Sequence, residues 1–462
     1  MSGLNRLSIQ EISSLIASKQ ASACEVAQAH IDEVNKTRSS INAFVHFEPD
    51  QVLAQLDHAP QGPLHGIPVT IKDSFDVAGL PTLCGSRFRI GHRASADATS
   101  VARLRAAGAI LLGKTNCPEF LSNYETDNHI IGRTNNPWNL DRTPGGSSGG
   151  EAAAIASFCS AGGIGSDGGG SVRLPAHFCG IAGLKPTPGR IPSTGHFPVI
   201  AHPGGLLGVA GPMARSAADL KILFEVLAGY DPFDPFSAPV SPAWPHVQRL
   251  RIGCMERFNN IPVHPDALDA TGKAARSFTD LGYIVDEFHP TGLERAPNLW
   301  SFFFSELAVP FTRVLLDGRE HEAHWTGTEF YDKLKNNPEP TGKQVVENLA
   351  ARDAIRRHVL EQMRDVPVIL SPVCSVAAFP HRQRRFTTES KEIGLFQAMM
   401  PLTWVNLLGL PAITIPMTVG TDGLPIGIQL IGRPWEEELL LDLAAKLEVI
   451  RGQFEFDLPF SR

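Results

Sequence analysis

Short apolar runs alternate with helical patterns along most of this chain, and this alternation restricts the fold more than any other feature. The runs are short, β-branched and typical of buried strands, and they cover 67–71, 110–112, 250–254, 283–285, 368–370, 412–416 and 426–431. Helical patterns follow Asp97, begin near Gly149, cover 216–228, follow Asp266, cover 344–363 and follow Trp435. Such alternation predicts the α/β class, with one large sheet covered by helices on both faces.

Two capping boxes stand near the start of the chain. Ser8 is followed three residues later by Glu11, and Ser22 by Glu25, each before apolar residues at helical spacing. In such a box the serine and the glutamate side chains both accept backbone N–H groups at the start of the helix. The pattern predicts a helical hairpin over about residues 8–36.

The length of 462 residues alone favours two domains, because single cores usually stop growing near roughly 250 to 300 residues. Hydrophobic residues make up 43% of the chain and charged residues 19%, which is enough apolar material for a large core. The Pro-, Ser- and Asp-rich stretch 231–247 is either a linker or a surface loop that crosses one domain. The α/β pattern resumes unchanged after it, which fits a loop.

Charge and cysteine content exclude several classes of protein. Lys and Arg total 41 against 48 Asp and Glu, a formal charge of −7, so no basic face for nucleic acid is indicated. The seven cysteines are scattered, odd in number and without CxxC spacing, which indicates reduced thiols in the cytoplasm. The chain has no apolar signal core and no run of about 18 uncharged apolar residues, so we predict neither secretion nor a membrane span.

Between Pro144 and Arg190, glycine is concentrated around two serine-containing segments. Residues 145–150 read GGSSGG before a small-residue helix, and residues 166–171 read SDGGGS after an apolar strand. Glycine permits positive φ angles and close backbone approach. Successive N–H groups beside a serine can then point at one spot, as an oxyanion hole requires.

A flexible linker and a phosphate-binding loop both fit these segments less well, and the histidines of the chain do not indicate a metal site. GGSSGG is a common linker sequence, but the apolar flanks 152–155 and 180–184 indicate burial. A phosphate-binding loop needs GxxxxGK[ST], or GxGxxG in register after a strand, and neither pattern occurs here. The histidines show no HxxxH or clustered spacing, so we predict no metal site.

The glycine-rich stretch resembles the amidase signature family. Family-like segments also occur outside it, namely GIPVTIKD over 66–73, NNPWN over 135–139, GLKPT over 183–187 and GLPA over 409–412. The resemblance therefore covers nearly the whole chain. It implies a single α/β/α domain with a mixed sheet over residues 1–462, in which a signature core over about 62–230 is completed by a C-terminal part over about 250–462.

The resemblance assigns three residues to catalysis. Ser171 matches the family's nucleophile, Ser147 its bridging serine on an unusual cis peptide, and Lys72 its base. Lys72 and Ser147 lie 75 residues apart, and Ser147 and Ser171 lie 24 apart, intervals that are typical of the family. Ser148 is the close competitor of Ser147. No metal or organic cofactor is implied.

The oxyanion hole implied by the resemblance consists of backbone N–H groups of one loop, those of Gly168, Gly169, Gly170 and Ser171. Many family members have threonine where this chain has Gly168. We expect this glycine to keep the N–H donor but to loosen the loop.

Further residues match positions around the reacting groups. We interpret Asp167 and Arg173 as structural supports of the glycine turn rather than as proton carriers. Four residues fall where family members contact substrate, namely Leu121, Ser122, Asn123 and Tyr124. The segment 302–304 and Trp404 offer apolar surface for an aryl or alkyl group.

A lysine can act as a base only when it is neutral. With an ordinary pKa near 10.4, about one lysine in 2,500 is neutral at pH 7. Deprotonating such a lysine therefore costs about 4.6 kcal/mol at this pH. Desolvation lowers a lysine pKa by up to about 3 to 5 units, and Lys72 ends an apolar run, so we expect it to be buried. The alternative is a surface lysine paired with Asp73 and Asp76, which would contribute little.

Three functions fit these residues. The first is a stand-alone serine hydrolase that cleaves the C–N bond of a small amide, anilide or carbamate (urethane) through an acyl-enzyme on Ser171. The second is a glutaminase-like A subunit of an aminoacyl-tRNA amidotransferase, and the third is an inactive binding protein, which the retained relay residues disfavour. Residues 191–198 and 204–208 lack the Ser-Ser-Leu-Asp-Gln run usual in the amidotransferase subunits, which favours the first. A homodimer is common in the family.

Overall fold

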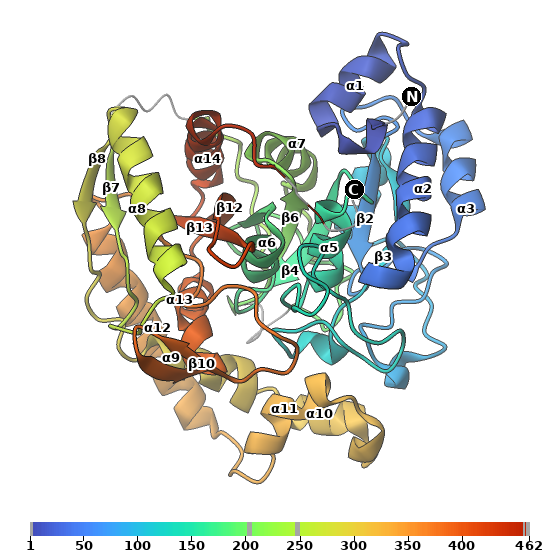
Figure 1. The fold of residues 1–462 in the computed structure, drawn as a ribbon. Coiled ribbons are helices and arrows are strands. Elements are labelled where there is room, and N and C mark those ends of the chain that lie inside the picture. Colours follow the sequence, from blue (N-terminus) through green and yellow to red (C-terminus); the bar gives the residue numbers. More distant parts are fainter. Residues whose placement is uncertain (1–2, 201–205, 245–249, 456–457, 459–462) are drawn as a thin grey trace.

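Eleven strands form one mixed sheet through the middle of the molecule (Figure 1). The computed structural model describes residues 3–200, 206–244, 250–455 and 458. In spatial order the strands are β1 (Phe44–His46), β3 (Ile110–Thr115), β2 (Pro68–Lys72), β4 (Gly162–Asp167), β6 (Val209–Ala214), β5 (Ala182–Lys185), β12 (Ala412–Val419), β13 (Pro425–Gly432), β9 (Val368–Pro372), β7 (Arg251–Cys254) and β8 (Ile284–Glu287). The prediction of an α/β fold with one large mixed sheet is confirmed.

The sheet is antiparallel across its centre and parallel on either side of it, and the edge strand β1 pairs antiparallel with β3. β2 pairs in parallel with β3 and β4, and β7 pairs in parallel with β8 and β9. All the pairs from β4 through β6, β5, β12 and β13 to β9 are antiparallel. A separate hairpin of β10 (Arg385–Thr388) and β11 (Lys391–Gly394) stands outside this sheet.

Helices cover both faces of the sheet. The α-helices of the described residues are α1 (Ile9–Ala17), α2 (Ala23–Ile41), α3 (Pro49–Ala54), α4 (Thr99–Ala106), α5 (Gly149–Ala156), α6 (Arg173–Cys179), α7 (Ala217–Leu227), α8 (Pro265–Asp280), α9 (Ala296–Ser301), α10 (Val309–Leu316), α11 (Trp325–Leu334), α12 (Gly342–Gln362), α13 (Leu395–Leu407) and α14 (Glu437–Arg451). A π-helical turn, η6 (Phe302–Glu306), follows α9 directly. Helices α10 and α11 lie at the lower edge of the molecule in Figure 1.

Alternating side chains of the central strands enter different cores. On β6, Ala210 and Ala214 belong to the largest core cluster, which also contains apolar residues of α4, α7, α8 and α14. Met213 of the same strand packs instead with residues of α5 and α6. Successive residues of a strand point to opposite faces, so α5 and α6 cover the face opposite α7 and α14.

Both predicted N-terminal capping boxes are present. The Ser8 side chain accepts the N–H of Glu11, whose carboxylate accepts the N–H of Ser8, and Ser22 and Glu25 make the same pair of contacts. The predicted hairpin is thus confirmed as α1 and α2, although the second helix continues to Ile41 rather than ending near residue 36.

The stretch 231–244 packs as a loop against the body of the molecule. Asp231 accepts a hydrogen bond from Thr99, Arg190 donates to the Val240 carbonyl, and the ring of Trp244 lies 4.0 Å from Lys221 Nζ. These contacts favour the loop over the linker; residues 245–247 lie outside the described residues. One domain over the whole chain stays a prediction, which the shared sheet supports.

One helical stretch, Ala296–Leu316, is long and apolar enough to cross a membrane by length and composition alone. It contains α9, η6 and α10, and 39% of its most apolar window is buried within the fold. A core helix of a soluble protein passes the same test, so this stretch is weak support for a membrane span. The predictions of no membrane span and of a cytoplasmic location stay predictions.

Candidate active site

Two neighbouring parallel strands bring the predicted residues to one edge of the sheet. β2 ends at Lys72 and β4 ends at Asp167, and the two strands pair in parallel with Ile71 opposite Ile164. Because the carboxyl ends of parallel strands meet at the same edge, Lys72 comes close to the loop 168–171 that follows β4. This places segments about a hundred residues apart beside one another.

The Lys72 ammonium group is surrounded by serine oxygens. Its Nζ lies 2.7 Å from Ser147 Oγ, 2.9 Å from Ser148 Oγ and 3.0 Å from Ser166 Oγ. It also lies 3.5 Å from the Ser166 carbonyl oxygen. Ser166 did not stand out in the sequence, because only the end of β4 places it opposite Lys72.

Lys72 is fully buried and differs in this from an ordinary lysine. Burial lowers the pKa of Lys72 to about 8, although the nearby Cys117, Cys84, Asp167 and Glu151 act in the opposite direction. Asp73, the partner expected for a surface lysine, pairs instead with Lys114 at 2.8 Å. The expected burial of Lys72 is therefore what the structure has.

Ser147 lies on the loop before α5, and the peptide bond between Gly146 and Ser147 is cis. Gly146 has no room for a side chain, since an added Cβ would lie 2.7 Å from the Asn123 carbonyl oxygen and 2.8 Å from the Glu125 nitrogen. The loop can therefore pass the segment 123–125 at this distance only with glycine at position 146.

Ser171 is the most accessible of the three predicted catalytic residues, with 8% of its surface exposed. Its carbonyl oxygen accepts the Ser148 N–H at 3.2 Å, which joins the two serine-containing loops. Within the described residues its hydroxyl has no hydrogen-bond partner. The structure thus forms the contact between Lys72 and Ser147 but no hydrogen bond between Ser147 and Ser171.

Two carbonyl oxygens of the loop 168–171 accept hydrogen bonds from aromatic side chains outside the loop. Trp300 Nε1 donates to the Gly168 oxygen at 2.9 Å, and the Tyr124 hydroxyl donates to the Gly169 oxygen at 3.2 Å. The expectation that Gly168 loosens the loop did not include these two hydrogen bonds, because their donors come from other segments of the chain. Both carbonyl groups are fixed by rings packed around the loop.

One of the predicted oxyanion donors has another partner. The Gly170 N–H donates to Asp167 Oδ1 at 2.7 Å, so it already has an acceptor inside the protein. Within the part of the chain that the structure describes, the N–H groups of Gly168, Gly169 and Ser171 have no hydrogen-bond partner. Three of the four predicted oxyanion donors are therefore without an acceptor inside this part of the protein.

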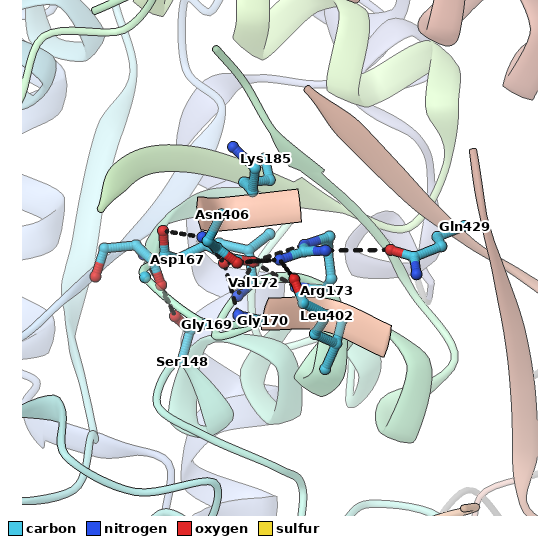
Figure 2. A network of polar contacts seen from close by, with 12 residues as sticks. Ser148, Asp167, Gly169, Gly170, Val172, Arg173, Lys185, Leu402, Asn406 and Gln429 are labelled. Atoms are coloured by element: carbon cyan, nitrogen blue, oxygen red, sulfur yellow. Dashed lines mark hydrogen bonds and ion pairs between the residues drawn. The ribbon is translucent and has the colours of Figure 1, made fainter. Parts of the chain in front are cut away.

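Asp167 and Arg173 form a buried ion pair behind the loop (Figure 2). Arg173 Nε lies 3.1 Å from Asp167 Oδ2, and both side chains are fully buried. The same carboxylate oxygen accepts the N–H groups of Val172 at 3.1 Å and Arg173 at 3.3 Å. Burial raises the pKa of Asp167, but the charge of Arg173 and its hydrogen bonds outweigh burial and lower it well below its ordinary range.

The ion pair is completed by residues from far along the chain. Asn406 Nδ2 donates to Asp167 Oδ1 at 2.9 Å, and its Oδ1 accepts from Arg173 at 2.5 Å. Arg173 also donates to the Leu402 carbonyl and to Gln429 Oε1, each at 3.1 Å (Figure 2). Helix α13 and strand β13 thus hold the loop after β4, a role that sequence spacing did not indicate.

The four residues matched to substrate contact have different surroundings in the structure. Tyr124 anchors Gly169, as described above, and Asn123 Nδ2 donates to Glu329 at 2.8 Å. Ser122 lines a small cavity of about 30 Å³ with Phe304 and residues of α10 and α11. Leu121 lies next to it in a left-handed backbone conformation, with φ 61°.

Part of the predicted apolar surface lies elsewhere. Trp404 is completely buried and stacks on Phe258 with ring centroids 6.1 Å apart, so it belongs to the core. Phe302 and Phe303 are also core residues. Phe304 of this run lies next to Gly168 of the loop.

No group of three or more His, Cys, Asp or Glu side chains is placed to hold a metal ion among the described residues. The seven cysteines are free thiols, and five of them are buried.

Comparison with known proteins places the chain in a family. The sequence model of the Amidase family matches residues 25–441. The chain belongs to the amidase family. Among solved structures, a bacterial aryl acylamidase of the amidase signature family is similar to this amidase, with a TM-score of 0.88 at 27% identity over 99% of both chains. The resemblance inferred from the sequence is thus confirmed.

Two curated relatives show the range of the family. The A subunit of glutamyl-tRNA(Gln) amidotransferase from Chloroflexus aurantiacus is 34% identical to this amidase over 477 residues, which cover 96% of both chains. An acylamidase of Rhodococcus erythropolis is 34% identical over 472 residues, which cover 97% of this chain and 96% of that one. This amidase is a hydrolase that acts on C–N amide bonds other than peptide bonds.

Proposed function

We propose that this amidase is a stand-alone serine hydrolase that cleaves a small apolar amide or anilide through an acyl-enzyme on Ser171. The observation that carries the proposal is the buried Lys72 Nζ, 2.7 Å from Ser147 Oγ and with its pKa lowered to about 8. At pH 7 this pKa leaves about one lysine in ten neutral. The free-energy cost of deprotonating the base is then about 1.4 kcal/mol instead of about 4.6 kcal/mol. Desolvation thereby supplies most of what a lysine base needs.

In the proposed acylation, neutral Lys72 takes the Ser147 proton while Ser147 takes the Ser171 proton. The Ser171 oxygen attacks the carbonyl carbon, and the carbonyl oxygen becomes an oxyanion on the free N–H groups of the loop 168–171. The relay then returns a proton to the nitrogen, the C–N bond breaks and the amine leaves. Water, deprotonated by the same relay, releases the acid from Ser171.

The hydroxyl of Ser171 without a partner is compatible with this scheme. It is free to turn toward Ser147 when a substrate carbonyl enters, and apo sites often have longer contacts than reacting complexes. The ion pair of Asp167 and Arg173 fixes the turn and carries no proton in the proposal, because the pKa of Asp167 lies far below neutrality.

The substrate class is inferred from the rings at the loop. Trp300 and Phe304 contact Gly168 and Gly169, whose N–H groups are among the proposed oxyanion donors. Aromatic surface favours an apolar acyl group over the charged amino and carboxylate groups of glutamine. Two similar proteins are an acylamidase and an aryl acylamidase, which agrees with this choice.

The second candidate is a glutaminase-like A subunit of an amidotransferase. It is favoured by the similarity to the C. aurantiacus protein over nearly the whole of both chains. Segments 191–198 and 204–208 lack the Ser-Ser-Leu-Asp-Gln run, which argues against this candidate. Residues 204 and 205 of the second segment lie outside the described residues. Glutaminase activity, or copurification of a partner protein, would favour this second candidate.

The deciding experiment is a substrate screen of the purified protein. It compares p-nitroanilides of increasing acyl length, primary amides, an aryl carbamate and glutamine, with release of the amine as the readout. Turnover of anilides without glutaminase activity is expected. Hydrolysis of glutamine alone would reject the stand-alone enzyme, and inactivity toward every compound would reject the hydrolase.

The pH profile should follow the Lys72 amine. The neutral fraction of Lys72 grows as the pH rises through its folded-state pKa of about 8, so kcat/KM should rise about tenfold per pH unit below it and level off above. The measurement is kcat/KM between about pH 6 and 10 with an anilide that does not titrate there. A flat profile across pH 8 would contradict the proposed base.

Ser147 and Ser148 both contact Lys72, and their alanine variants should differ. Ser147→Ala interrupts the relay and should lower kcat about 10²- to 10⁴-fold. Ser148 Oγ donates to the Ser166 carbonyl at 3.3 Å and accepts its N–H at 3.4 Å, so Ser148→Ala should cost less than about tenfold. The two variants are compared by kcat under saturating anilide, and equal losses would show that the assignment of Ser147 is wrong.

A further inference from the structure

Gly168 and Phe304 form a contact that restricts both the loop and its surroundings. A Cβ built on Gly168 would lie 3.1 Å from Phe304 Cε2 and 3.7 Å from Cδ2. Its φ angle is not in the left-handed region, so the backbone itself would accept a side chain. The ring of Phe304 is therefore what disfavours a side chain at position 168.

Phe304 is itself held in place by Trp300. The two rings are nearly parallel, with centroids 4.5 Å apart and an interplanar angle of 14°. Trp300 is almost completely buried and donates from Nε1 to the Gly168 oxygen at 2.9 Å, while the residues are spaced by four on the continuous helix of α9 and η6. One rigid ring thus fixes a loop carbonyl and supports the ring beside it.

Phe304 also lines a small cavity. Phe304 lines the space of about 30 Å³ under α10 and α11, together with Ser122, Val309 and Phe330. Such a volume holds little more than a water molecule. Phe304, which is half-buried, thus contacts Gly168 and also lines this space, so a smaller side chain at position 304 would enlarge it.

We propose that the ring of Phe304 is the wall of the acyl-binding pocket and limits the size of the acyl group. Trp300 supports this ring, and the absence of a side chain at Gly168 leaves room for it. The inference rests on the proposed function. The departing nitrogen must face Ser147 to receive a proton, so the acyl chain points away from the relay, toward the side of the loop that Phe304 covers. The wall selects short or flat acyl groups and excludes bulky ones.

The first test measures acyl preference. Phe304→Ala and the milder Phe304→Leu should raise kcat/KM for hexanoyl and branched p-nitroanilides relative to acetyl by about tenfold or more, since one methylene in such a pocket changes rates by about 10- to 200-fold. Phe303→Leu is the matched control, because Phe303 is buried in the adjacent core and should leave the preference unchanged.

A double-mutant cycle tests the contact itself. Gly168→Ala should push the loop away from Phe304 and lower kcat about tenfold with little change in KM, because oxyanion donors act only in the transition state. In the Phe304→Ala background the same change should cost less than about twofold. Gly169→Ala is the control, since its Cβ would lie 2.4 Å from the Trp300 ring, and Phe304→Ala should not rescue it.

The outcomes separate the two proposals. Unchanged acyl preference in both Phe304 variants, with an active wild type, would overturn the wall while leaving the proposed function intact. Equal costs of Gly168→Ala with and without Phe304 would do the same. Inactivity of the wild type toward the whole series would reject the proposed function and the wall together.

Discussion

Lys72→Ala will lower kcat for anilide hydrolysis by about 10⁴- to 10⁶-fold, and Ser171→Ala will do the same. Removal of one member of a catalytic unit costs nearly as much as removal of all of them, because the members act on the same proton. In the proposed relay, Lys72 is the base at the buried end and Ser171 carries the acyl group. The measurement is single-turnover acylation, which separates chemistry from product release.

Lys72→Met is the informative variant of the pair, because it keeps most of the volume of the buried chain and removes the amine. Lys343→Ala is the matched control, since 81% of that lysine side chain is exposed and its ion pair with Glu347 contributes little. Both variants should unfold near the wild-type temperature. Near-normal rates in Lys72→Met would exclude the proposed base, and accumulation of an acyl-enzyme in Ser171→Ala would exclude the nucleophile.

The sequence predicted the fold where local signals were strong. The capping boxes at Ser8 and Ser22 and the runs that became β2, β3, β9, β12 and β13 depend on neighbours in the chain, so a single sequence displays them. Strands β1, β5 and β6 were not predicted, because their short, glycine-containing or small-residue sequences lack an alternating pattern. Their pairing is decided by the long-range sheet.

The site divides in the same way. Lys72, Ser147 and Ser171 stand in contiguous motifs and were found from them, although their catalytic roles stay predictions. Trp300 and Asn406 reach the loop from segments more than a hundred residues away and carry no local signal. For that reason the loosening expected from Gly168 did not account for the ring that occupies the space beside it.

The buried pair of Asp167 and Arg173 carries the second large expected effect. Asp167→Asn leaves Arg173 charged, fully buried and without its carboxylate, and loss of one partner of a buried pair costs about 3 to 5 kcal/mol. The free energy of unfolding at pH 7 should fall by this amount in urea titrations. Asp286→Asn is the control, because Asp286 and Arg251 are about half exposed and their pair should contribute less than about 1 kcal/mol.

The pH dependence gives this prediction a second readout. The folded-state pKa of Asp167 is lowered below its unfolded value of about 3.9, so its contribution is fully present above that value and is lost as the pH falls through the folded-state pKa. The stability gap between the wild type and Asp167→Asn should therefore be constant near neutrality and narrow below about pH 4. A gap that narrows between pH 6 and 8 would instead assign the effect to a group that titrates there, and an absent gap would show that the hydrogen bonds of Asn406 and Gln429 hold Arg173 without the carboxylate.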